Sequence, residues 1–221
     1  GSFTTASIAD ANALNVGGDA GTLSADAGGA LDFTGGSYTT LNGTAGGNIS
    51  QSGALTVTGT TTLTADTNAI TATLTDATND FATVDLLTAN GGSFTTASIT
   101  DTNALNVGGD AGTLTADAGG ALDFTGGSYT TLNGTAGGNI SQSGALTVSG
   151  TTTLTSDSTT ITATLTEATN NFGTVSLVSA GTGSFTTATI TDTNALNVGG
   201  DAGTLTADAG GALDFTGGSY T

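Results

Sequence analysis

Short stretches of this chain alternate apolar and polar residues. Residues 13–16 (ALNV), 30–33 (ALDF) and 54–57 (ALTV) are versions of one four-residue phrase, and residues 69–72 (AITA) are a looser one. In a β-strand this alternation sends successive side chains to opposite faces, so that one face is apolar. Runs rich in Thr, Val, Ile and Phe lie between the phrases, and paired glycines supply turns. The pattern predicts roughly ten short strands in residues 1–91 and no amphipathic helix.

The chain is built from a sequence repeat of 91 residues. Residues 1–91 and 92–182 are identical at 75 of 91 positions, and residues 183–221 begin a third copy. Most differences exchange small or polar residues, and the only aliphatic exchange is Leu87 for Val178. Self-similarity at a fixed period is typical of solenoids and of tandem domain arrays.

Two all-β architectures fit this repeat: tandem β-sandwich domains and a parallel β-solenoid of stacked coils. Three observations favour the solenoid. The phrases inside a repeat resemble one another, as the strands of stacked coils do. Residues 183–221 would make only part of a sandwich. The chain contains 37 Gly but no Pro or Trp, which suits short strands and tight corners.

We therefore expect one continuous solenoid with about five coils of roughly 18 residues in each repeat. The phrases recur at uneven intervals, so we expect residues 46–53 to form an extra loop or an extra strand of one longer coil. Equivalent residues of successive coils lie about 4.8 Å apart, where two carboxylates repel each other by on the order of 1 kcal/mol. The polar position of the phrase reads Asn15, Asp32 and Thr56. We expect these three residues to stack, with neutral neighbours on both sides of the carboxylate.

Seven residue types are absent from the 221 residues: Lys, Arg, His, Cys, Pro, Met and Trp. The 18 acidic residues give a formal charge of -18, which excludes binding to a nucleic-acid backbone and attraction to an anionic membrane. No run of about 18 apolar residues predicts a membrane span, and the first residues do not resemble a signal peptide. The missing side chains also exclude disulfides and the thiolate and imidazole metal sites.

The composition argues against an enzyme. Ser and Thr are abundant, but no His or Lys is present to activate them as nucleophiles. Carboxylates alone could serve a glycosidase, and the densest acidic group is Asp76, Asp80 and Asp85. The second repeat keeps a carboxylate at only one of these positions, Glu167. Two copies of one catalytic site are therefore not expected.

Oxygen ligands are the only metal ligands that this chain offers, and they suit Ca²⁺. Residues 17–21 (GGDAG) and 28–32 (GGALD) resemble the calcium-binding β-roll motif without matching it. The weak candidate ligands are Asp19, Asp26, Asp32, Asp110, Asp117 and Asp123. An aspartate at a corner also caps a turn and keeps the surface soluble, and this is the interpretation that we favour. We expect no cofactor and no built metal site, with diffuse Ca²⁺ association as the alternative.

Three stretches resemble the repeats of filamentous-haemagglutinin-like bacterial surface proteins. They are residues 47–65 (GNISQSGALTVTGTTTLTA), 69–81 (AITATLTDATNDF) and 101–105 (DTNAL), and the resemblance extends over essentially the whole chain. It implies the shaft of a large secreted adhesin, built as a right-handed parallel β-helix and located outside the cell or at its surface. No segment matches the secretion domain or a receptor-binding module of that family.

These observations predict a mechanical function, that of an extracellular fibre or shaft segment. Open coils expose unpaired backbone groups. We therefore expect the segment to join copies of itself end to end, or to form part of a longer repetitive chain. The alternatives are an adhesin module that binds a receptor and a calcium-dependent matrix protein.

Overall fold

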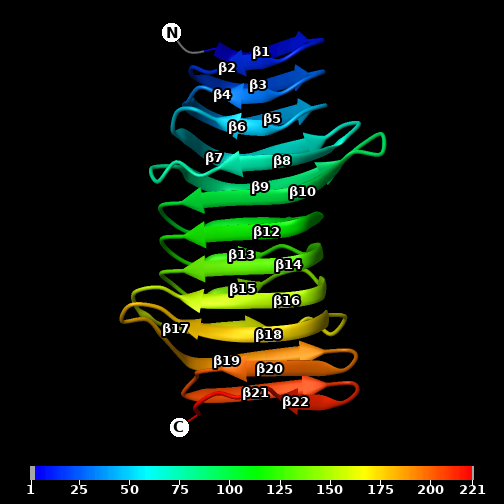
Figure 1. Ribbon diagram of the computed structural model, residues 1–221. Helices are drawn as coiled ribbons and strands as arrows, with labels where there is room; N and C mark the ends of the chain where they lie inside the picture. The colour runs from blue at the N-terminus through cyan, green and yellow to red at the C-terminus, as the bar shows by residue number, and fades with distance from the viewer. Residues whose placement is uncertain (1–2, 221) are drawn as a thin grey trace. The chain divides into compact units, whose positions relative to one another are not determined.

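Residues 3–220, which the computed structural model describes, form an all-β parallel β-solenoid. It has about 11 coils of about 19 residues, and none of the described residues lies in a helix (Figure 1). Within each part of the chain, each strand pairs in parallel with strands two positions away in chain order. This confirms the predicted solenoid and excludes the sandwich alternative, whose strands would pair antiparallel. No helix in residues 3–220 is long and apolar enough to cross a membrane.

The chain divides into two compact units, Gly1–Ala111 and Gly112–Thr221. The first eleven strands are β1 (Phe3–Asp10), β2 (Leu14–Val16), β3 (Ala20–Ala27), β4 (Leu31–Phe33), β5 (Gly36–Ala45), β6 (Ile49–Gln51), β7 (Leu55–Ala65), β8 (Ala69–Leu74), β9 (Asp80–Thr88), β10 (Ser93–Asp101) and β11 (Leu105–Gly109). The other eleven are β12 (Ala111–Ala118), β13 (Leu122–Phe124), β14 (Gly127–Ala136), β15 (Ile140–Gln142), β16 (Leu146–Ser156), β17 (Thr160–Leu165), β18 (Asn171–Ser179), β19 (Ser184–Asp192), β20 (Leu196–Gly200), β21 (Thr204–Ala209) and β22 (Leu213–Phe215).

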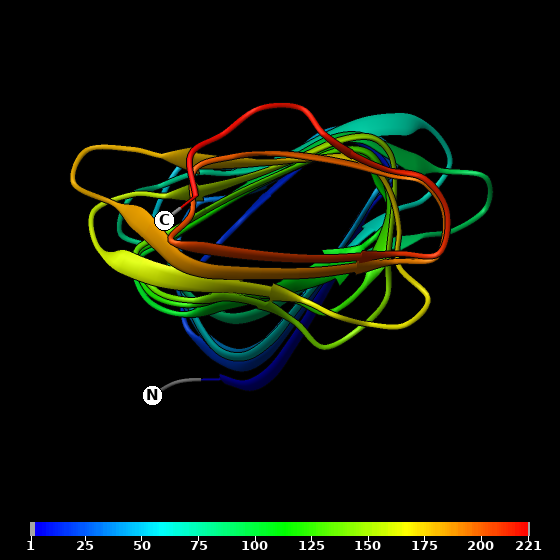
Figure 2. The same ribbon diagram turned by 90° about the horizontal axis from the view of Figure 1, so that it is seen from below.

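Each coil runs along one sheet and returns along the other (Figure 2). In the first unit β1, β3, β5, β7 and β9 pair in this order, and the even-numbered strands form the opposite sheet. The length of a coil follows from the residues that lie side by side. Phe3 lies beside Ala20, and Thr56 lies beside Asp80, which is a clearly larger step along the chain. The coils are therefore uneven in length, as the spacing of the phrases predicted.

One 91-residue repeat contains nine strands, and therefore four and a half coils instead of the expected five. In the first unit β10 is the sequence copy of β1, and β11 is the copy of β2. β1 pairs with β3 in one sheet, whereas β10 pairs with β8 in the other, and β2 and β11 are exchanged in the same way. In the second unit β13 pairs with β15, and its copy β22 pairs with β20 in the opposite sheet. Equivalent strands of successive repeats thus alternate between the two sheets.

The observed pairing within the first repeat corrects the predicted column of polar residues. Asn15 lies beside Asp32, as predicted, but the next residue of the column is Ser50. Thr56 lies in the opposite sheet, beside Ser37. Residues 46–53 were expected to form an extra loop or an extra strand, but they contain β6, which pairs with β4 and β8 as a regular strand of its sheet. The prediction of the column was wrong because it assigned every phrase to one sheet, although β7, which contains Thr56, comes three strands after β4, which contains Asp32, and therefore belongs to the other sheet.

The interior of each coil is apolar. Leu31, Phe33 and Leu55 are 0% exposed, and burying each side chain contributes roughly 1.5–3 kcal/mol. Small residues make room for large ones: a Cβ on Gly43 would lie 2.7 Å from the end of the Phe33 ring. Tyr38 is also buried. The apolar alternation seen in the phrases is thus the inward face of the strands.

Candidate functional site

Two of the candidate calcium ligands, Asp32 and its copy Asp123, bind serines of the next coil. Ser50 Oγ donates to Asp32 Oδ1 at 2.9 Å, and Ser52 Oγ donates to Oδ2 at 2.6 Å. Asp123 accepts the same pair of bonds in the second repeat, at 2.7 and 2.6 Å. Both oxygens of each carboxylate are therefore engaged by neutral hydroxyls, which link one coil to the next.

Asp19 caps a corner. Its Oδ1 accepts a hydrogen bond from the backbone N–H of Ser37 at 2.9 Å, and Asp201 makes the same cap in the third repeat. Burial, and then the charge of Asp19, raise the pKa of the Tyr38 hydroxyl, so the phenol stays protonated. Asp110, the equivalent residue of the second repeat, is exposed.

Asp26 and Asp117 lie on outward positions of a sheet. Asp26 is exposed and lies between Ala9 and Thr44 of the adjacent coils. Partial burial, and then the charge of Asp157, raise the pKa of Asp117. In the described part of the chain, no three His, Cys, Asp or Glu side chains gather closely enough to hold a metal ion. The six candidate ligands thus occupy corners and faces where each has its own local partners or is exposed.

Two members of the acidic group in the first repeat have separate structural roles. Thr78 donates its N–H at 2.9 Å and its Oγ1 hydroxyl at 2.6 Å to Asp76 Oδ1. These two bonds lower the pKa of Asp76 and hold the turn after β8. Asp85 lies in β9 beside Thr62, where burial raises the pKa of its carboxyl.

The structure also contains a polar pair that the sequence did not indicate. Gln51 Nε2 donates to Asn79 Oδ1, and Asn79 Nδ2 donates to Gln51 Oε1, both at 2.8 Å. Asn79 is 0% exposed. Its Oδ1 also accepts the backbone N–H of Leu55 at 3.0 Å, and Gln51 Nε2 donates to the Gly53 carbonyl at 2.9 Å. The pair therefore fastens the end of β6 and the start of β7 to the loop before β9.

The second repeat contains the same pair, formed by Gln142 and Asn170 with two bonds of 2.8 Å. Gln51 and Gln142 are the only glutamines of the chain. A residue type that occurs once per full repeat, in a background of Ser and Thr, was the signal available for finding this pair.

Asp101 is a buried corner residue that also carries backbone bonds between coils. Its Oδ1 accepts the N–H of Phe81 at 2.6 Å, and its Oδ2 accepts the N–H of Asn103 at 2.9 Å. Burial raises the pKa of Asp101, although these bonds oppose the shift, and the nearby charge of Asp80 raises it further. Asp192 holds the N–H of Phe172 in the same way at 2.7 Å.

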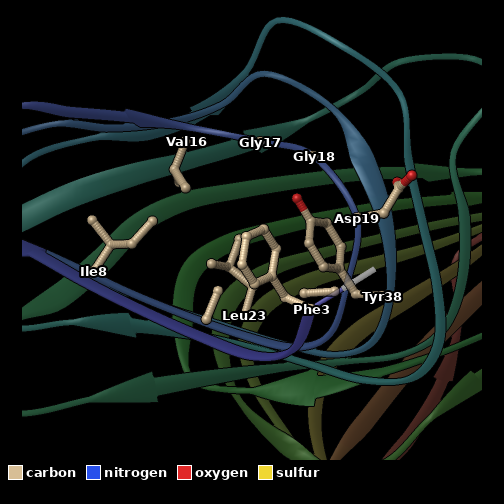
Figure 3. A pocket seen from close by; sticks show the side chains of 10 residues that line it. Phe3, Ile8, Val16, Gly17, Gly18, Asp19, Leu23 and Tyr38 are labelled. Atoms are coloured by element: carbon tan, nitrogen blue, oxygen red, sulfur yellow. The ribbon is translucent and has the colours of Figure 1, made fainter. Parts of the chain in front are cut away.

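A hollow in the first unit lies over its first coil. It has a volume of about 620 Å³, and Phe3, Ile8, Val16, Leu23 and Tyr38 contribute to its lining. Figure 3 shows these side chains directed into the same space. Phe3 is 71% exposed. The hollow is thus the uncovered apolar interior of the first coil.

A family model described as "Repeats of unknown function (DUF5649)" matches residues 20–88 and 111–179. The two matches start 91 residues apart and together make up more than half of the chain. No curated protein and no solved structure gives a significant match.

Proposed function

Since the chain belongs to this family of repeats of unknown function, we propose that its role is mechanical: it is a shaft segment of an extracellular or cell-surface fibre. The observation that carries the proposal is the pairing of successive coils. Within each unit every coil is hydrogen-bonded to the next along both sheets, and apolar columns such as Leu14, Leu31 and Ile49 run through the interior. Such a ladder resists extension and exposes little unpaired backbone along its sides.

The side chains between coils support the same role. Asp32 binds two hydroxyls of the following coil, and Asp101 binds a backbone N–H of the preceding one. These carboxylates therefore act as links along the shaft. The absence of Lys and Arg leaves trypsin-like proteases no cleavage site, which suits a fibre exposed to the environment.

The resemblance of residues 47–65 to filamentous-haemagglutinin-like repeats extends the proposal to the shaft of a surface adhesin. The partner of such a segment is another coil of the same kind, supplied by a longer repetitive chain or by a second copy. A receptor-binding module and a calcium-dependent matrix protein are the rival functions.

Arrays of two, four and six repeats test the proposal. At about 4.8 Å per coil, four and a half coils should add roughly 22 Å of length for each repeat. Small-angle scattering and electron microscopy measure this increment, with Ca²⁺ in one series and a chelator in the other. Lengths that do not grow with repeat number would contradict a shaft. Shortening in the chelator series alone would favour the calcium-dependent matrix protein.

A further inference from the structure

Apolar residues of the first coil are exposed, whereas their copies in the second repeat are buried. Phe3 is 71% exposed and Ile8 is 40% exposed. Their copies Phe94 and Ile99 are 2% and 1% exposed. The sequence GSFTTASI is identical at both places, so the difference comes from what covers it.

Residues 69–88 are the coil that covers the second repeat. Ile70 of β8 lies beside Phe94, and Leu74 lies beside Ile99. In the other sheet, Val84 of β9 lies beside Val107, the copy of Val16. The strands of this coil therefore supply one apolar partner for each of the three residues.

The third repeat is covered by the equivalent coil. Ile161 lies beside Phe185, and Leu165 lies beside Ile190. Phe185 is 2% exposed. A coil with the same inward apolar residues, Ile70 and Leu74 or their copies Ile161 and Leu165, thus covers the equivalent surface once in each unit.

Polar features of the first coil also match this occupant. Asp10, the copy of Asp101, accepts the local N–H of Asn12 at 2.9 Å, as Asp101 does with Asn103. Asp101 uses its other oxygen for the N–H of Phe81 in the covering coil. The first coil therefore already holds a carboxylate oriented for such a bond.

A glycine provides the space that the covering coil needs. Gly109 has a φ of 101°, and a Cβ there would collide with the Leu86 carbonyl of the covering coil. Gly18, its copy in the first coil, has a φ of 104° with nothing within 4 Å of a Cβ. Gly18 in the first coil thus already has the left-handed conformation that favours glycine. The space that the covering coil occupies beside Gly109 is empty beside Gly18.

We propose that the first-coil face, formed by Phe3, Ile8, Val16, Leu23 and Tyr38, is a docking site for a parallel coil with the sequence of residues 69–88. The inference rests on the proposed shaft function and names the partner of this face. The occupant is chosen because residues 69–88 cover the copy of this face in the second repeat, and residues 160–179 cover it in the third.

The test adds a copy of residues 66–91 in front of Gly1, with the phenylalanine of the added copy changed to tryptophan. The protein has no other tryptophan. We expect its emission to shift to the blue and amide exchange in residues 3–10 to slow by about tenfold or more. A matched control carries Asp at the added positions that correspond to Ile70 and Leu74, and it should leave exchange unchanged.

Two further arms make the result decisive. The first places a copy of residues 20–45, which has the same length, in front of Gly1, and equal protection by this segment would overturn the selectivity. The second adds a synthetic peptide of residues 66–91 to the unmodified chain. If amide exchange in residues 3–10 changes neither with the added peptide nor with the added copy, the proposed docking site is wrong. The unmodified chain is also examined by sedimentation. If it forms long rods and the peptide does not disperse them, the occupant of this face is a second copy of the chain instead. The array measurements determine the spacing of internal coils. They therefore test the proposed shaft function independently of the docking experiment.

Discussion

Gln51 and Asn79 hold each other through two hydrogen bonds of 2.8 Å, although they are 28 residues apart in the chain. The pair fixes the loop before β9 against the end of β6 and the start of β7. Because Asn79 is fully buried, none of its amide atoms can find water when its partner is lost. Such a pair stabilises one arrangement of the loop against all others.

Replacing Gln51 or Asn79 with alanine should lower the free energy of unfolding by about 2–4 kcal/mol, since each change leaves buried donors and acceptors without partners. Denaturant unfolding measures the loss, and the double variant should lose less than the sum of the two single changes. Asn42→Ala is the matched control, because the Asn42 side chain makes one bond of 3.3 Å to Ser24. Equal losses at Asn42 and Asn79 would contradict a special role for the pair.

Thr61 carries a buried hydroxyl that has no hydrogen-bond partner, and Thr152 repeats this in the second repeat. Both residues are 0% exposed. An unsatisfied buried hydroxyl costs about 1–3 kcal/mol, so Thr61→Val should raise the free energy of unfolding by about 1 kcal/mol or more. Thr62→Val, on the outward neighbour, should change it by less than about 0.5 kcal/mol. Destabilisation by Thr61→Val would show that an internal water satisfies the hydroxyl.

Leu55 and Thr56 are neighbours on opposite faces of β7. Leu55 is 0% exposed, so Leu55→Asp places an unpaired charge in the core and should lower the free energy of unfolding by more than about 4 kcal/mol. Thr56→Asp points away from the interior but lies beside Asp80, so it should cost only about the 1 kcal/mol of carboxylate repulsion, well below the cost of Leu55→Asp. Thermal unfolding followed by circular dichroism compares the two variants. Similar melting temperatures would mean that β7 does not present Leu55 to the core.

The pH dependence of stability should be opposite to that of most proteins. The pKa of Asp85, Asp101 and Asp117 is raised above the ordinary value of 3.8, with burial as the largest cause. The folded chain therefore binds more protons than the unfolded chain between that value and the raised ones. Stability falls as the pH rises through this window and increases as the pH is lowered into it. Asp76, whose pKa is lowered, opposes this trend, but it is exposed and its contribution is screened.

We expect the melting temperature to rise by a few degrees between pH 7 and about pH 4, helped by the loss of repulsion among 18 carboxylates that no cation balances. Asp85→Ser copies the second repeat, which has Ser176 at this position. The variant should be more stable than the original at pH 7 and should show a smaller gain on acidification. A melting temperature that falls steadily with acid would refute the assignment of these carboxyls.

The fold class followed from two properties that stacking imposes on a sequence. The phrases of residues 13–16 and 30–33 resemble each other because they occupy neighbouring coils of one sheet and share a single apolar column. Alternation with period two placed Leu14, Leu31 and Leu55 on inward positions, and the burial of Leu31 and Leu55 confirms this. Tertiary packing and local pattern therefore agree along most of the repeat.

The residues that lie side by side in successive coils could not be predicted from the sequence. Coil length changes from one part of the repeat to another, so spacing alone could not show that Ser50, and not Thr56, follows Asp32. The Gln51–Asn79 pair and the Asp101 corner depend on contacts between residues that lie in different coils. The strand and turn preferences of single residues carry no information about such contacts. In an unstacked chain the same side chains would form hydrogen bonds with water instead.

Each repeat has nine strands, which is an odd number, so the sheet to which a given strand belongs changes from one repeat of an array to the next. After an odd number of repeats, the next copy of a given strand belongs to the opposite sheet, and only an even number returns it to the original sheet. A module attached behind two repeats would face the same way as one attached in front of them, whereas a module attached behind one or three would face away. Adding or deleting a single repeat therefore changes the direction in which an attached module faces, as well as its distance from the first coil.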